Sequence, residues 1–165
     1  MRKILALAVC SVFLFAATAH AELSIAVFDL QDVAAKSDVL KEGQAAVNKA
    51  FKPRKDKLDK DAEVLKTKAD AVAKGATEAQ RTEFLNLQRS YNESATAYME
   101  ELQKAELRIR QDVDLVILEA AKKYAKKKGY NLILDSNSAL YFEDSMDVTK
   151  EMLTEVNAQW RSMKK

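Results

Sequence analysis

Large residues recur at every seventh position in two stretches of the chain, which are separated by a break near residue 75. In the first stretch the repeating positions are Phe51, Leu58, Leu65 and Val72. In the second, two rows are present: Phe84, Tyr91, Tyr98 and Ala105, and Ala95, Leu102, Ile109 and Val116. An apolar repeat of seven is typical of helices that pack lengthwise against a partner. The pattern predicts two long helices that fold back on each other as an antiparallel coiled-coil hairpin.

The residues around the break favour a tight turn between these helices. Gly75 suits the left-handed conformation that closes a helix. Thr77 and Gln80 have the spacing of a capping box, which begins the next helix. Ser37 is a suitable N-cap for the first helix. We therefore expect a first helix of about 36 residues, or roughly 54 Å, a tip near residue 75, and a second helix that ends near Lys128.

The seam between the two predicted helices is thin. Lys55 and Asp112 occupy seam positions, and several other seam positions hold alanine, which buries far less apolar area than leucine. Pro53 lies inside the first helix, where it removes a backbone hydrogen bond and favours a kink. These features predict arms that bend, and they also fit a marginal hairpin that is held at its base.

The two ends of the chain have strand-like patterns. Residues 23–28, 130–135 and 139–142 are short β-rich runs, and the last two are predicted to form a hairpin. Residues 148–163 are predicted to form a final amphipathic helix, whose apolar face consists of Met152, Leu153, Val156 and Trp160. Three short strands and one helix bury only a small apolar area. We therefore expect strands from several copies of the chain to meet in one body.

The sequence thus predicts an α+β fold that is mainly α, in three parts. Residues 1–21 are expected to be a signal peptide. Residues 22–40 and 112–165 are expected to form a discontinuous, β-rich oligomerisation body, from which residues 41–111 project as a helical hairpin. The candidate residues for oligomerisation are Ile25, Val27, Leu132, Leu134, Leu140 and Phe142.

The first 21 residues have the composition of an export signal. Arg2 and Lys3 are basic, residues 4–17 are largely apolar, and Ala19 and Ala21 are the small residues that a signal peptidase reads. The apolar run is shorter than the span of about 18 residues that crosses a membrane. We therefore expect cleavage and a periplasmic location, in preference to a retained N-terminal anchor.

The same segment holds the only cysteine, Cys10, and the only histidine, His20. After cleavage the chain has neither a thiol nor an imidazole. It therefore lacks the side chains for a disulfide, for a Cys/His metal site, and for a Ser-His-Asp or Cys-His catalytic unit. We expect no catalytic residue, no metal site, no cofactor and no enzymatic activity.

Charge is distributed unevenly along the chain. Residues 41–128 have 20 basic and 15 acidic side chains, whereas residues 22–40 and 129–165 together have 5 basic and 10 acidic ones. The densest basic cluster consists of Lys122, Lys123, Lys126, Lys127 and Lys128. It fits an anion or membrane-surface patch, but we favour a role in complementing the negative end of a helix that Gly129 stops. Binding to nucleic acid is not expected of an exported protein.

Several motifs resemble the OmpH/Skp chaperone family. Residues 25–29 (IAVFD) resemble its first strand, and residues 51–54 (FKPR) resemble a stretch early in its first long arm. The most specific match is residues 129–135 (GYNLILD), followed by 138–141 (SALY) and 147–149 (DVT). These three resemble the family's G-Y-x-L-V-L-D strand, its A-x-x-Y strand and the D-[IV]-T opening of its last helix. The resemblance covers essentially the whole chain after residue 21.

The resemblance implies a jellyfish-shaped homotrimer, with a β-barrel body and three helical arms around a cavity. It further implies an ATP-independent periplasmic holding chaperone that binds unfolded outer-membrane proteins and delivers them toward the outer membrane and its assembly machinery. Well-known members are strongly basic, whereas this chain is neutral after residue 21. Contact with a membrane surface or lipopolysaccharide is therefore not carried over.

A holding chaperone needs apolar surface that is exposed but dispersed. The candidate client-binding residues, which lie outside the seam in our register, are Val64, Leu85, Met99 and Leu107. In a register shifted by one residue they would pack internally instead. Met99 is the strongest candidate because its flexible thioether adapts to varied partners. The alternative classes are a non-catalytic coiled-coil scaffold or spacer of the cell envelope, and an enzyme, for which no convergent polar site is visible.

Overall fold

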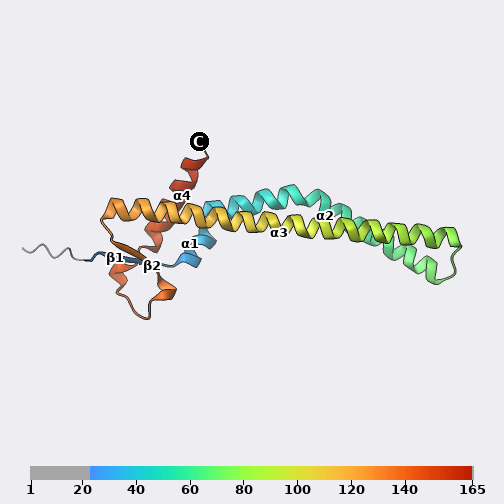
Figure 1. Cartoon of the computed structure of the whole chain (residues 1–165), viewed down its shortest axis with the longest axis horizontal. Helices are drawn as coiled ribbons and strands as arrows, with labels where there is room; N and C mark the ends of the chain where they lie inside the picture. Colours follow the sequence, from blue (N-terminus) through green and yellow to red (C-terminus); the bar gives the residue numbers. More distant parts are fainter. Residues whose placement is uncertain (1–22, 165) are drawn as a thin grey trace, which may run out of the picture.

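The computed structural model describes residues 23–164, in which an arm of two long helices projects from a small base (Figure 1). The elements in chain order are β1 (Ile25–Phe28), α1 (Leu30–Lys36), α2 (Asp38–Ala73), α3 (Glu78–Lys128), β2 (Leu132–Asp135), the 3₁₀ turns η1 (Ser136–Ser138) and η2 (Asp144–Met146), and α4 (Thr149–Met163). The expected signal peptide, residues 1–21, lies outside the described residues. Within residues 23–164, no helix combines the length and the apolar content that crossing a membrane requires.

The two arm helices begin where local capping signals place them. Before α2, Ser37 Oγ accepts a hydrogen bond from the backbone N–H of Leu40 at 3.3 Å. Before α3, Thr77 Oγ1 accepts from the N–H of Gln80 at 3.3 Å, and Gln80 Oε1 accepts from the N–H of Thr77 at 2.9 Å. Gly75, in the turn between the helices, has a φ of 112°, which glycine adopts without steric cost. The hairpin tip therefore lies at the predicted position.

The seam of the arm is only partly buried. The rings of Phe51 and Tyr98 meet edge to face with 5.7 Å between their centroids. Arg54 forms an ion pair with Glu101, and its guanidinium carbon lies 5.9 Å from the Tyr98 ring centroid. Yet every residue from 40 to 108 is exposed or half-buried, including the seam positions. Contacts along the arm are consequently too sparse to act as a core of their own.

The path of α2 changes along the arm. It stays one continuous helix through Pro53, but it bows away from α3 in the half nearer the base and crosses α3 farther out (Figure 1). Close approach occurs at Gly43, where an added Cβ would lie 3.1 Å from the side chain of Ile109. Around Pro53, three lysines pair with aspartates four residues later in the helix, at Lys52–Asp56, Lys55–Asp59 and Lys57–Asp61. Each such pair adds about 0.2–0.5 kcal/mol of helix stability.

The hydrophobic core lies in the base. It is built from the last turns of α3, one face of α4, and side chains of β1, α1 and the start of α2. Its buried members are Ala26, Phe28, Val33, Val39, Ile109, Val113, Val116, Ile117, Ala120, Tyr124, Val148, Met152 and Val156. Burial raises the pKa of the Tyr124 hydroxyl, because the ionised form is poorly solvated there. The final helix, expected at 148–163, is α4.

The predicted strand hairpin is wrong. β2 pairs instead with β1, in parallel, with Ile25 opposite Leu132. Residues 136–138 form a 3₁₀ turn capped by Asp135, whose Oδ1 accepts from the N–H of Asn137 at 3.3 Å. This turn leads the chain away from β2, so residues 139–142 have no strand partner in the described chain. On the other edge of β1, the N–H of Val148 donates to the carbonyl of Val27 at 2.8 Å.

Replacement of Met152 by alanine tests where the stability of the protein resides. Met152 is fully buried between α4 and the rest of the base core. Truncation leaves a cavity, so Met152→Ala should lower the free energy of unfolding by about 2–5 kcal/mol. Urea unfolding followed by circular dichroism measures this change.

Met163 provides a matched control, because it lies on the same helix and is 47% exposed. Met163→Ala should change the free energy of unfolding by less than about 0.5 kcal/mol. Equal effects of the two substitutions would contradict the placement of the core.

Candidate functional site

The arm exposes four large apolar side chains to solvent. They are the four residues that the sequence register leaves outside the seam, with exposed fractions of 46% for Val64, 57% for Leu85, 68% for Met99 and 54% for Leu107. The structure does not pack any of them between α2 and α3, which is where the shifted register would put them. Single apolar residues are common on protein surfaces, so these four are notable as a set that lies along one projecting arm.

Three of these residues share one side of α3. Leu85, Met99 and Leu107 fall within roughly 80° of the helix circumference. They are spaced roughly 21 Å and 12 Å apart along the axis, with polar and charged residues between them. Such spacing keeps each apolar spot small. Dispersed spots avoid the contiguous patches that drive a protein to aggregate with itself.

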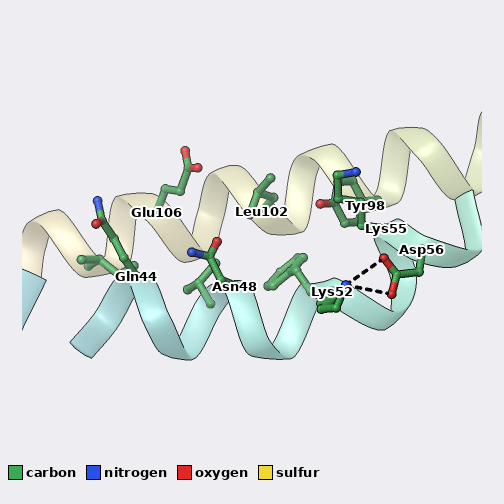
Figure 2. Close-up of a pocket in the computed structure, with 11 residues that line it drawn as sticks. Gln44, Asn48, Lys52, Lys55, Asp56, Tyr98, Leu102 and Glu106 are labelled. Carbon is green, nitrogen blue, oxygen red and sulfur yellow. Dashed lines mark hydrogen bonds and ion pairs between the residues drawn. The ribbon is translucent and has the colours of Figure 1, made fainter. Parts of the chain in front are cut away.

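The bow in α2 leaves a groove between the two arm helices, with a volume of about 650 Å³. Figure 2 shows Gln44 and Asn48 on α2 extending toward α3 across it, whereas Lys52 is directed along α2 toward Asp56. The complete lining is Gln44, Val47, Asn48, Phe51, Lys52, Lys55, Asp56, Tyr98, Leu102, Glu106 and Ile109. A second groove of about 700 Å³ shares Val47, Phe51 and Ile109 with the first and is also lined by Leu107. Neither groove is predicted by the sequence pattern, although Gly43 and Pro53 lie in the segment of α2 that forms them.

The two lysines that line the first groove are paired with aspartates on the same helix. The ammonium of Lys55 donates a hydrogen bond to Asp59 at 2.8 Å, and this bond raises the pKa of Lys55 above its usual value. Lys52 pairs with Asp56 at 3.2 Å (Figure 2). A lysine held in its charged form cannot act as a base or nucleophile. Among residues 23–164, no cluster of three metal-ligating side chains occurs.

Four of the five lysines in the basic cluster at the end of α3 contact side chains of the same chain. The contacts are Lys122 with Glu119 at 2.9 Å, Lys123 with Gln159 at 2.6 Å, Lys127 with Glu155 at 2.7 Å, and Lys128 at 6.0 Å from the Tyr124 ring centroid. Lys126, Lys127 and Lys128 lie in the last turn of α3, which Gly129 ends with a φ of 78°. The cluster thus complements the helix end and ties α3 to α4, in keeping with the interpretation that we favoured.

The candidate oligomerisation residues divide into two groups. Val27 is buried in the chain's own core, and the side chains of Ile25, Leu134 and Phe142 are half-buried. The exposed group consists of Leu132 and the fully exposed Leu140, to which the structure adds Leu23 and Tyr141, which sequence reasoning did not single out. Two further leucines, Leu115 and Leu118, are exposed on α3 within the base. The base therefore exposes several large apolar side chains that do not belong to its hydrophobic core.

Comparison with known proteins gives a family match that spans most of the chain. The sequence profile of the family described as Outer membrane protein (OmpH-like) matches residues 24–156. The fold is similar to that in the crystal structure of a proposed OmpH-like outer membrane chaperone from Caulobacter crescentus CB15. That similarity has a TM-score of 0.57 at 16% identity, and it covers 82% of this chain and 85% of the other. No curated protein matches the sequence. Since the profile covers both arm helices, the sheet and half of α4, the chain belongs to the OmpH-like family.

Proposed function

We propose that this protein is an ATP-independent holding chaperone of the periplasm. It binds unfolded outer-membrane proteins between the helical arms of a homotrimer and prevents their aggregation before membrane insertion. The observation that carries the proposal is the exposure of Val64, Leu85, Met99 and Leu107 on an arm that projects from the base. Membership of the OmpH-like family and the fold shared with a proposed outer membrane chaperone support it. No catalytic residue, cofactor or metal takes part.

The strength of the arm contacts suits holding followed by release. Complete burial of a leucine or methionine side chain is worth about 1.5–3 kcal/mol. The four arm residues are about half exposed before a client binds, so a client that covers about two-thirds of the exposed part gains roughly 0.5–1 kcal/mol per contact. A client is then held by the sum of several weak contacts over three arms, each of which opens without an energy source. Tight binding at a single pocket would hinder this release.

Self-association follows from the open surface of the base. An isolated two-stranded sheet is marginally stable, and within the described residues β2 is paired along one edge only. Leu132 lies on that strand, and Leu140 and Tyr141 follow it in a segment without regular structure. We infer that these residues meet the base of neighbouring copies. The number three comes from the family resemblance.

Location and further partners follow from the two ends of the chain. Residues 1–21 have the pattern of a cleavable signal, which supports export to the periplasm. Delivery of clients would bring the protein to the outer-membrane assembly machinery. We do not propose contact with lipopolysaccharide or a membrane surface, because four of the five clustered lysines have partners within the chain.

The role of the four exposed arm residues in client binding can be tested by replacing all of them with polar residues in one variant. The variant Val64→Thr, Leu85→Gln, Met99→Gln, Leu107→Gln should lose roughly 2–4 kcal/mol of client binding for each arm that the client contacts, or at least about 30-fold in Kd. The measurement is light scattering by an unfolded outer-membrane protein diluted from urea, with and without the chaperone. The wild-type protein should suppress scattering at about equal molar amounts.

A matched control changes four exposed polar residues of α3 to alanine: Thr82, Gln88, Thr96 and Gln103. This control should suppress scattering as well as the wild type does. Failure of the wild-type protein to suppress scattering at any salt concentration would refute the holding function and leave a scaffold. Full activity of the quadruple variant would refute the assignment of the client-binding residues.

The assembly is tested by native mass measurement. The wild-type protein should have the mass of three chains, and the variant Leu140→Ser, Tyr141→Ser should shift toward monomer at micromolar concentration. These two side chains do not contribute to the chain's own core, so the variant's helical circular dichroism should persist. A monomeric wild-type protein would contradict the proposed cavity between arms.

A further inference from the structure

The C-terminal half of α4 contacts the start of α2 through four polar side chains. They are Asn157, Trp160, Arg161 and Lys164, whose spacing puts them on one face of the helix. In Figure 1, α4 crosses the base end of α3, and its C-terminus emerges beside the start of α2. The four residues are far from α2 in sequence, so these contacts join two ends of the chain.

The contacts are directed at two acidic residues in the first turns of α2. The N–H of Asp38 donates to Asn157 Oδ1 at 2.8 Å, and Asp38 Oδ2 accepts from Arg161 at 3.2 Å. One turn later, Glu42 Oε2 accepts from Trp160 Nε1 at 3.0 Å and from the ammonium of Lys164.

These hydrogen bonds have a measurable electrostatic consequence. The hydrogen bond from Lys164, followed by that from Trp160, lowers the pKa of Glu42 below its usual value. The indole N–H and the cation thus favour the charged form of Glu42.

The rest of α4 is firmly anchored elsewhere. Met152 and Val156 are fully buried in the base core. Gln159 accepts a hydrogen bond from Lys123 on α3. α4 is therefore fixed to α3 and the core at its beginning, and it holds α2 at its end.

The direct packing of α2 on α3 near the base is only half-buried. Gly43 approaches Ile109 closely, Val47 packs partly exposed against the base core, and the Phe51–Tyr98 ring pair lies two turns beyond Gly43. The two grooves lie along this stretch, and no residue of α2 is buried there. Because the seam is open to solvent here, the contacts from α4 add to what fixes the direction in which α2 leaves the base.

We propose that residues 157–164 of α4 act as a strap that sets the angle between α2 and the base. When the strap is released, α2 swings about the Gly43–Ile109 contact, and the grooves widen or close. If the proposed chaperone function holds, on which this consequence rests, the strap also sets how much space the arms leave for a client.

The test measures the distance between the arm and the base. Spin labels are placed at Lys60→Cys on α2 and Lys126→Cys on α3, two exposed positions, in a Cys10→Ser background and diluted with unlabelled protein. Pulsed electron resonance then gives the distribution of arm-to-base distances. The strap is cut from one side by Arg161→Gln, Lys164→Gln and from the other side by Asp38→Asn, Glu42→Gln.

Both strap variants should broaden the distance distribution about twofold, and their combination should broaden it no further, because both remove the same two ion pairs, Asp38–Arg161 and Glu42–Lys164. The control, Lys52→Gln, Lys57→Gln, removes two ion pairs that lie within α2 and should leave the distribution unchanged. All substituted side chains are at least one-third exposed, so the fold should persist, as circular dichroism can verify.

The strap proposal would be overturned if both strap variants had the same distance distribution as the wild type. It would also be overturned if the control variant broadened the distribution equally. The outcome is independent of the chaperone function, because the distances are measured without a client. If the chaperone function is absent, light scattering by the aggregating client would be the same with and without the wild-type protein.

Discussion

The burial of the base end of α3 is the constraint on which the rest of the structure depends. Side chains of α1, α4 and β1 pack against Ile109, Val113, Val116, Ile117 and Ala120 of this segment. Among residues 23–164, the buried apolar side chains are concentrated in this cluster. Because burial of apolar area is the dominant favourable term in folding, the base anchors the arm. The outer part of α3 and nearly all of α2 extend from this anchor with half-buried contacts at most.

The weakness of the arm and its proposed use have the same physical origin. A seam rich in alanine and interrupted by lysine gives the arm little buried area, and apolar side chains such as Met99 and Leu107 lie outside the seam and remain more than half exposed. The arm thus offers apolar side chains that a client could cover. Charged and amide side chains between the exposed residues keep the arm soluble, so the same sequence pattern supports both solubility and weak, distributed binding.

Local signals in the sequence predicted the arm, but they could not predict the sheet. The two helices and their tip follow from the seven-residue apolar repeat, from Gly75 and from the Thr77–Gln80 capping box. Each of these signals acts between residues that are close in sequence. The pairing of β2 with β1 depends on residues more than 100 positions apart, and the short run at 139–142 looks like a strand whatever its partner. The exposure of Val64 and Leu85 followed from the register, whereas the grooves depend on how far α2 bows, which no local pattern encodes.

Native-state hydrogen exchange along α3 tests the central claim, that the base holds an arm with little stability of its own. Amides at 109–124 should exchange only through global unfolding, whereas amides at 78–100 should exchange by local opening and lose protection toward the tip. A gradient of this kind within a single continuous helix is the predicted result. Uniform protection from the tip to the base of α3 would contradict the account.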